Sequence, residues 1–250
     1  MLMILALFAC KVVDAPADLE ELATFTFANF DDPAALEAAV DSFPQLVDDN
    51  LEALEKGYRV DDLSADHLES AGISEAEIAG VIGAMGTVTY ASRLRDVLDI
   101  CTARNKATLY DNVLDYDVLS STDRRCFLGE SCEQYDESVD ETTKITLLGE
   151  ASRTFDATYR WVEDSDGNSL VVARTLSPDP VSFSTKIAKV HQQYALVLLY
   201  DDGKRTRRVE TFWVDAELVG LDVPDSFAVD NAINSMAAQA ERVDEQISGG

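Results

Sequence analysis

Few side chains of this 250-residue chain have the types and spacing that catalysis requires. Its two histidines, His67 and His191, stand in no recognisable catalytic setting, and there is no Gly-x-Ser-x-Gly nucleophile elbow. Phosphate-binding loops and dinucleotide fingerprints are absent from the sequence as well. We therefore expect no catalytic residue and no cofactor, and we interpret the chain as a protein that is not an enzyme.

Two acidic segments have residue types that bind cations. Residues 164–168 have the composition of a calcium loop but lack its closing glutamate, so a hairpin turn explains them better. The run of Asp136, Glu137, Asp140 and Glu141 has no recognised ligand spacing, and we interpret it as a solvated loop. Zinc is disfavoured because the sequence has no Cys-x-x-Cys and the histidines are far from the cysteines. The sequence therefore predicts no metal site.

A cysteine near the start offers a different chemistry, the attachment of a lipid. It follows nine apolar residues, a run too short to cross about 30 Å of hydrocarbon and typical of the core of a secretion signal. The quartet Leu7-Phe8-Ala9-Cys10 resembles the lipobox of bacterial lipoproteins. The resemblance implies that residues 1–9 are a removed signal peptide and that Cys10 is acylated, for example with palmitate. Residues 10–18 would then tether the fold to a membrane of the bacterial cell envelope, at its periplasmic face or at the cell surface. The alternative is a short apolar strand or helix of a cytosolic domain.

The other cysteines are Cys101, Cys126 and Cys132. If Cys10 is acylated, these three can form at most one intramolecular disulfide. We predict a bond between Cys126 and Cys132, because Gly129 permits the tight turn that brings such close positions together. Cys101 would remain as a buried thiol. In a reducing cytosol all three would stay thiols.

The formal net charge of −27, from 20 Lys+Arg and 47 Asp+Glu, limits the partners. Such a charge repels phosphate backbones and anionic headgroups, which disfavours nucleic-acid binding and electrostatic attachment to membranes. A membrane partner would therefore be held through the N-terminal lipid. Cation binding is one use of the acidic surface, but we favour a solvated surface adapted to salt or solubility.

Residues 19–120 are predicted to form a helical region. Asp32 can cap a helix with Pro33 in its first turn, and residues 74–77 have the capping-box pattern of another helix start. The uncharged segment 78–92, with glycines at three-residue steps, is shorter than a membrane span. We predict a buried central helix there rather than membrane insertion.

Residues 121–250 change to the alternating pattern of strands. Phe155, Tyr159 and Trp161 fall on one face of a predicted strand, and turns at 164–168 and 201–204 divide a meander. A final helix begins at about residue 224, with an apolar stripe that includes Ile233 and Met236. The predicted fold class is therefore α+β, a helical region followed by an antiparallel meander that a long C-terminal helix closes. We expect residues 121–250 to pack with the helical region as one body.

This arrangement resembles the helix-grip fold of START-like lipid-transfer domains. Residues 194–200, the turn at 202–203, residues 210–218 and residues 220–224 carry the resemblance, which covers about 143–246. It implies a pocket for an apolar ligand between the curved sheet and the last helix. The pocket candidates are Phe155, Tyr159, Trp161, Trp213, Ile233 and Met236. Two hypotheses remain open, namely binding of an apolar small molecule and an interaction or scaffold lipoprotein whose own side chains fill the core.

Overall fold

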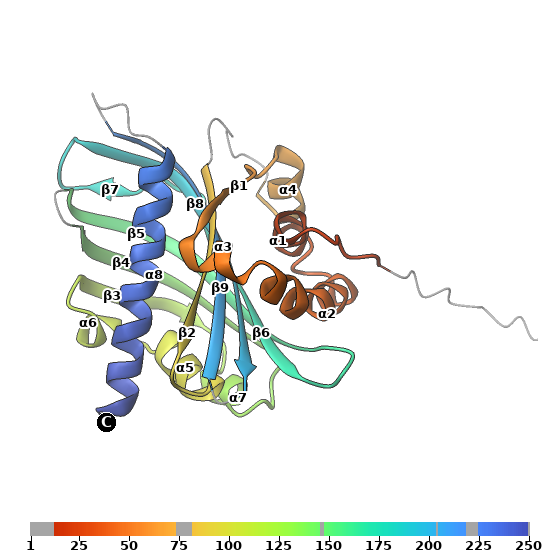
Figure 1. The fold of residues 1–250 in the computed structure, drawn as a ribbon. Helices are drawn as coiled ribbons and strands as arrows, with labels where there is room; N and C mark the ends of the chain where they lie inside the picture. Colours follow the sequence, from red (N-terminus) through yellow and green to blue (C-terminus); the bar gives the residue numbers. More distant parts are fainter. Residues whose placement is uncertain (1–12, 74–81, 146–147, 204, 219–224, 250) are drawn as a thin grey trace, which may run out of the picture.

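The computed structural model describes residues 13–73, 82–145, 148–203, 205–218 and 225–249, in which the chain forms eight helices and a nine-stranded antiparallel sheet (Figure 1). The predicted α+β class, an antiparallel meander closed by a long C-terminal helix, is confirmed. The lipobox at Cys10 and the capping-box pattern at 74–77 lie outside the described residues.

The strands follow the order β1-β2-β9-β8-β6-β5-β4-β3, and β7 pairs with β5. The predicted turn at 164–168 connects β5 to β6. β8 pairs with β9 on either side of the second predicted turn, of which residue 204 lies outside the described residues. β2 joins the sheet from the N-terminal part of the chain and pairs with β9 over its whole length. The strand bounds are β1 Tyr58–Val60, β2 Ile82–Tyr90, β3 Val113–Ser121, β4 Gln134–Ile145, β5 Gly149–Glu163, β6 Ser169–Ser177, β7 Ser182–Phe183, β8 Ala188–Asp202 and β9 Arg205–Leu218.

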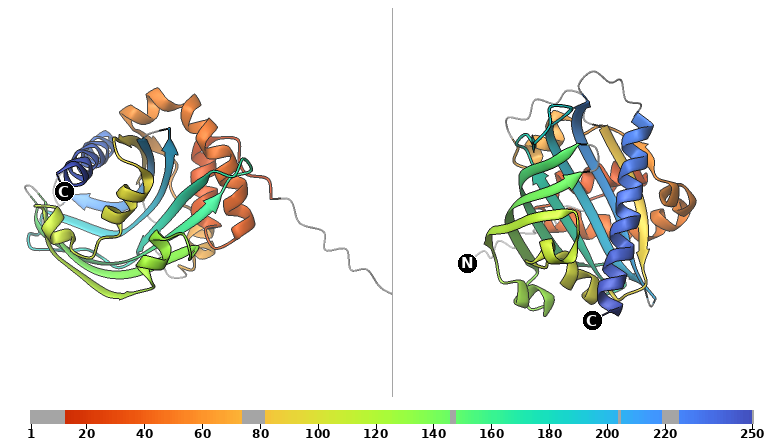
Figure 2. Two further views of the ribbon diagram at one scale, coloured as in Figure 1. Left: turned by 90° about the horizontal axis from the view of Figure 1, so that it is seen from below. Right: turned by 90° about the vertical axis from the view of Figure 1, so that its left-hand side faces the viewer.

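The sheet curves around α8, while α1 and α2 lie on its opposite face and α5 to α7 lie at one end of the curve (Figure 2). We call the face toward α8 the inner face; it carries Tyr159, Val171 and Leu199. The face toward α1 and α2 is the outer face. The helix bounds are α1 Leu19–Ala28, α2 Pro33–Asp49, α3 Leu51–Lys56, α4 Ala65–Ser70, α5 Leu94–Cys101, α6 Lys106–Leu109, α7 Arg124–Leu128 and α8 Asp225–Ser248.

The N-terminal helices pack on the outer face and close a hydrophobic core there. Asp32 caps α2 as predicted, because its side chain accepts a hydrogen bond from the backbone of the second helical residue at 3.0 Å. Phe27 of α1 meets Trp213 of β9 edge to face, with ring centroids 5.2 Å apart. Asp31 forms ion pairs with two arginines of the sheet, Arg174 at 2.7 Å and Arg160 at 3.1 Å. These contacts attach the helices to the sheet.

The prediction of a central helix over 78–92 is wrong for the described residues 82–90, which form strand β2. Its glycines serve the sheet, because each makes room for a large side chain. A Cβ added at Gly86 would lie 2.1 Å from Ile233 of α8, and one at Gly83 would lie 2.8 Å from the Trp213 ring. The region 19–120 is therefore not purely helical, since it also contributes β1 and β3 to the sheet.

The acidic run at 136–141 is not a solvated loop. It forms the middle of β4, where strand alternation divides its members between the two faces. Glu137 and Glu141 are buried, with 3% and 8% of their surface exposed, whereas Asp140 is exposed. The sequence did not predict this strand, because charged residues on both of its faces obscure the alternation of apolar and polar residues.

Candidate functional site

The inner face carries an aromatic wall built from β5, β4 and α7. Phe155, Tyr159 and Trp161 all belong to this cluster, as the alternation of β5 predicted. Phe127 of α7 lies 5.6 Å from the Trp161 ring and 6.3 Å from the Tyr159 ring, between centroids. The Trp161 indole N–H donates to the Phe127 carbonyl at 3.0 Å. Aromatic side chains thus line the curve of the sheet opposite α8.

Part of the inner face between this wall and α8 stays accessible, and we call this partly exposed region the hollow. Burial raises the pKa of Tyr159 and of Cys101, and Arg208 is equally enclosed by protein, yet each of the three keeps part of its surface accessible. Further side chains of the inner face are partly exposed, namely Val88, Thr175, Ala195, Val197 and Phe212. The lining is mainly apolar.

A polar cluster lies within this apolar lining. Arg208 of β9 donates to the Tyr90 hydroxyl at 3.1 Å and to Gln239 of α8 at 2.8 Å, and it pairs with Glu210 at 2.6 Å. Burial lowers the pKa of Arg208, but Glu210 and Tyr90 outweigh this effect and hold it well above its ordinary value. Burial also raises the pKa of Tyr90 to about 12, so this hydroxyl is protonated at neutral pH.

One donor of the cluster retains hydrogen-bonding capacity. Arg208 Nε is buried and has no hydrogen-bond partner among the described residues, whereas Glu210 Oε2 lies in the ion pair with Arg208 Nη2. Buried polar groups without a partner are uncommon in native proteins, because each costs about 1 to 3 kcal/mol. The Nε–H of Arg208 therefore remains available as a donor to a polar group that enters the hollow.

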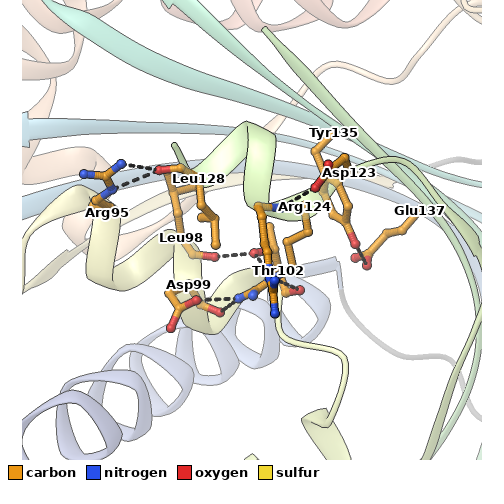
Figure 3. Close-up of polar contacts among 10 residues, drawn as sticks. Arg95, Leu98, Asp99, Thr102, Asp123, Arg124, Leu128, Tyr135 and Glu137 are labelled. Atoms are coloured by element: carbon orange, nitrogen blue, oxygen red, sulfur yellow. Dashed lines mark hydrogen bonds and ion pairs between the residues drawn. The ribbon is translucent and has the colours of Figure 1, made fainter. Parts of the chain in front are cut away.

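Glu137 forms a second buried polar centre near α7 (Figure 3). Its carboxylate accepts hydrogen bonds from the hydroxyls of Tyr135 at 2.9 Å and Tyr116 at 3.2 Å. Burial and the Glu137 carboxylate together raise the pKa of Tyr135 to about 12. Both tyrosines thus remain neutral donors, which stabilises a carboxylate inside the protein.

The two candidates on α8 occupy different places. Met236 is buried, with 6% of its surface exposed. Ile233 packs into the spaces left by Gly57 and Gly86, so it holds α8 against the edge of the sheet near β1 and β2. The side chains of residues 225–232 lie outside what the structure describes.

Trp213 does not line the hollow, contrary to the prediction. It is fully buried on the outer face, where its indole N–H donates to the Asp61 carbonyl at 3.1 Å. The alternation along β9 placed Val209 and Trp213 on one face correctly, but it could not say which face looks toward α8. Arg208, Glu210 and Phe212 point inward from this strand.

The cysteines and histidines that the sequence offered have other roles in the structure. A disulfide joins Cys126 and Cys132, with Cα atoms 5.2 Å apart, and Cys101 is left as a thiol. His67 accepts a hydrogen bond from the Ser64 backbone N–H at the start of α4, and His191 is exposed. Among the described residues no group of three or more His, Cys, Asp or Glu side chains is placed to hold a metal ion.

Sequence reasoning missed Arg208, Glu210, Tyr90 and Glu137. The spacing of Arg208 and Glu210 places both on one face of a strand, opposite Val209, and this was the available signal. Tyr90 and Glu137 gave no comparable signal, because their strands were not recognised.

None of the helices in the described part of the chain is long and apolar enough to cross a membrane.

No protein-family model matches the sequence, and no curated protein matches it. Among solved structures, the chain is similar to a START superfamily protein from Mycobacterium smegmatis, with 9% identity and a TM-score of 0.44 over 68% of this chain and 99% of that one. It is similar to human STARD10 with 10% identity and a TM-score of 0.43, over 82% and 80% of the two chains. The Zhui aromatase/cyclase from Streptomcyes sp. R1128 has 15% identity and a TM-score of 0.40, over 68% and 94%.

Proposed function

We propose that this protein binds a small, mainly apolar molecule in the hollow between the inner face of the sheet and α8, without converting it. The observation that supports the proposal is the accessible surface kept by Tyr159, Cys101 and Arg208 deep inside the protein. Ligand sites are typically apolar hollows with a few placed polar groups. Arg208 and Glu210 are such groups, so the ligand carries at least one oxygen or nitrogen that can meet them.

The ligand-binding body is proposed to be held at a membrane of the bacterial cell envelope. The supporting observation is the quartet that ends at Cys10, which would be acylated after removal of residues 1–9, with residues 10–18 as a short tether. Replacing Cys10 by serine should release the protein from the membrane fraction or leave the precursor uncleaved. If labelled palmitate does not enter the unaltered protein, the anchor is wrong and the binding proposal stands alone.

A second candidate is an interaction or scaffold protein without a ligand. It is favoured by the aromatic packing near α7, where Phe127 and Tyr135 are fully buried and fill that end of the curve. In this alternative the remaining hollow would hold only water.

Mass spectrometry of an organic extract distinguishes the two candidates. The protein is purified from its native membrane, and the extract is compared with that of a Met236→Trp variant purified in parallel, in which the larger indole occupies space beside the hollow. Binding predicts an apolar compound at near-equimolar amount that is depleted in the variant. An extract with no such compound, or equal amounts from both proteins, contradicts the proposal.

A further inference from the structure

The charge of this chain is unevenly distributed along the sequence, and the stretch that forms one end of the fold has no net charge. Residues 93–125, which include α5, α6, β3 and the start of α7, contain six basic and six acidic residues, so the whole net charge of −27 resides on the rest of the chain. At physiological salt, charges separated by more than about 8 Å are largely screened. The stretch that forms this end therefore adds no net negative charge to repel an anion.

A pocket of about 590 Å³ opens at this end, between α5, α6 and the start of α7. Its lining contains three arginines, Arg104, Arg124 and Arg125, and two aspartates, Asp99 and Asp123. Ile100 and Leu109 also line the pocket, and both pack against the inner-face cluster. The pocket therefore shares a wall with the interior of the fold.

The charges of this pocket are not equally available. Arg124 is committed to α5, because it donates to Thr102 Oγ1 at 2.9 Å and to Asp99 Oδ1 at 2.6 Å (Figure 3). This pair neutralises Asp99. Asp123 caps α7 and accepts from the backbone N–H groups of Arg125 and Cys126 at 3.0 and 3.1 Å.

Two guanidinium groups remain available. The exposed side chain of Arg125 has no hydrogen-bond or ionic partner within the described ranges. Arg104 makes one hydrogen bond, to Ser121 Oγ. Its positive charge also reaches the inner polar centre, where it lowers the otherwise raised pKa of Tyr135. A guanidinium has five N–H donors, which suit the paired oxygens of phosphate or carboxylate.

The supports of the pocket are rigid. The disulfide between Cys126 and Cys132 closes the loop that follows α7. Arg95 of α5 donates twice to the Leu128 carbonyl, at 2.9 and 2.6 Å, and so fixes the end of α7 (Figure 3). Arg125 is thus presented from a fixed backbone, which lowers the entropy lost on binding.

We infer that Arg104 and Arg125 form a binding site for an oxyanion, a phosphate or carboxylate group, at the α5–α7 end of the fold. Resting on the proposed function, the inference makes the ligand an anionic amphiphile, whose apolar body occupies the hollow and whose head lies in this pocket. Ile100 and Leu109 line this pocket and pack against the inner-face cluster, so the two sites are neighbours.

The test compares three probes by calorimetry at physiological salt, namely inorganic phosphate, dodecyl phosphate below its micelle concentration, and dodecanol. Arg125→Gln and Arg104→Gln should each weaken dodecyl phosphate binding about tenfold and leave dodecanol binding unchanged. Lys186→Gln is the control, because it removes one positive charge from an exposed side chain beside β7. The exposed side chain of Arg125 makes no hydrogen bond or ion pair within the described residues, so its variant should fold normally, which circular dichroism checks.

The outcomes separate the site from the proposed function. Arginine-dependent binding of inorganic phosphate, with no binding of dodecanol, supports the oxyanion site and contradicts the apolar hollow as a ligand site. Dodecanol binding together with equal losses for Arg125→Gln and Lys186→Gln contradicts the oxyanion site, because only the overall charge would then matter. Absence of arginine-dependent binding of any phosphate probe overturns the inference.

Discussion

Replacing Glu210 by glutamine tests whether Arg208 is held in the interior by its partner. The side chains of Arg208 and Glu210 are 11% and 17% exposed and lie 2.6 Å apart. Removing one member of a buried ion pair costs about 3 to 5 kcal/mol, because the other charge is left without compensation. Arg208 keeps its hydrogen bonds to Tyr90 and Gln239, so we expect the lower end of that range, about 3 kcal/mol.

Urea denaturation of the purified protein measures this loss of stability. Two further variants provide the comparison. The double variant Arg208→Met, Glu210→Leu should unfold within about 1 kcal/mol of the unaltered protein, because a well-packed apolar pair replaces a buried ion pair at little cost. Glu52→Gln disrupts an exposed pair with Lys56 and should change the free energy of unfolding by less than about 0.5 kcal/mol. If Glu210→Gln changes stability no more than Glu52→Gln, the pair is solvated and the reasoning about the cluster fails.

Four other changes have defined results. Trp213→Ala should lower the free energy of unfolding by about 3 to 5 kcal/mol and leave binding of an apolar dye unchanged, because the ring is fully buried on the outer face. Ala195→Trp should weaken dye binding strongly with little loss of stability, because Ala195 is partly exposed on the inner face. Burial raises the pKa of Tyr90 from 10.0 to about 12, so its contribution to stability is complete below pH 10 and is lost as the pH rises through 12; Tyr90→Phe should reduce this loss in alkaline titrations. Replacing Cys126 and Cys132 by serine should cost about 2 kcal/mol and speed hydrogen exchange in α7, because the small loop constrains the unfolded chain only modestly.

Contrary results are equally specific. Loss of dye binding in Trp213→Ala would show that Trp213 contacts the ligand. Full dye binding in Ala195→Trp would mean that the inner face is not the binding site. An unchanged alkaline transition in Tyr90→Phe would assign that transition to other tyrosines. Hydrogen exchange that quickens throughout the sheet in the serine variant would show that the disulfide supports the whole fold.

The C-terminal fold could be predicted because its strands follow simple alternation. Phe155, Tyr159 and Trp161 occur at even spacing and share the inner face, and turn residues at 164–168 mark the hairpin. The apolar stripe of α8 predicted its helical state in the same way.

β2 and β4 could not be predicted from composition. In β2, glycines at three-residue steps resemble a helical packing stripe, but Gly86 makes room for Ile233, and Gly83 makes room for Val60 and Trp213. In β4, carboxylates hide the alternation, and burial of Glu137 depends on hydroxyls supplied by β3 and by a neighbouring position of β4. Such partners are distant in sequence or belong to an unrecognised strand.

The polar cluster around Arg208 was missed for a related reason. Alternation gives two faces for each strand but does not say which one looks toward α8. That choice follows from the N-terminal helices, whose core residues, such as Phe27, occupy the outer face and take Trp213 as their partner. With Trp213 outward, Arg208 and Glu210 must point inward.

The most direct test of the central claim is a titration with an environment-sensitive apolar dye on the full chain and on two matched tryptophan variants of α8. Met236 is buried and Ala237 is exposed, so Met236→Trp adds bulk beside the hollow while Ala237→Trp adds it toward solvent. A ligand site predicts saturable binding that Met236→Trp weakens while the protein stays folded and that Ala237→Trp leaves unchanged. Absence of saturable binding, together with a loss of 2 to 5 kcal/mol in Met236→Ala, about the cost of truncating a packed core side chain, would contradict the claim and leave a protein whose own side chains fill its core.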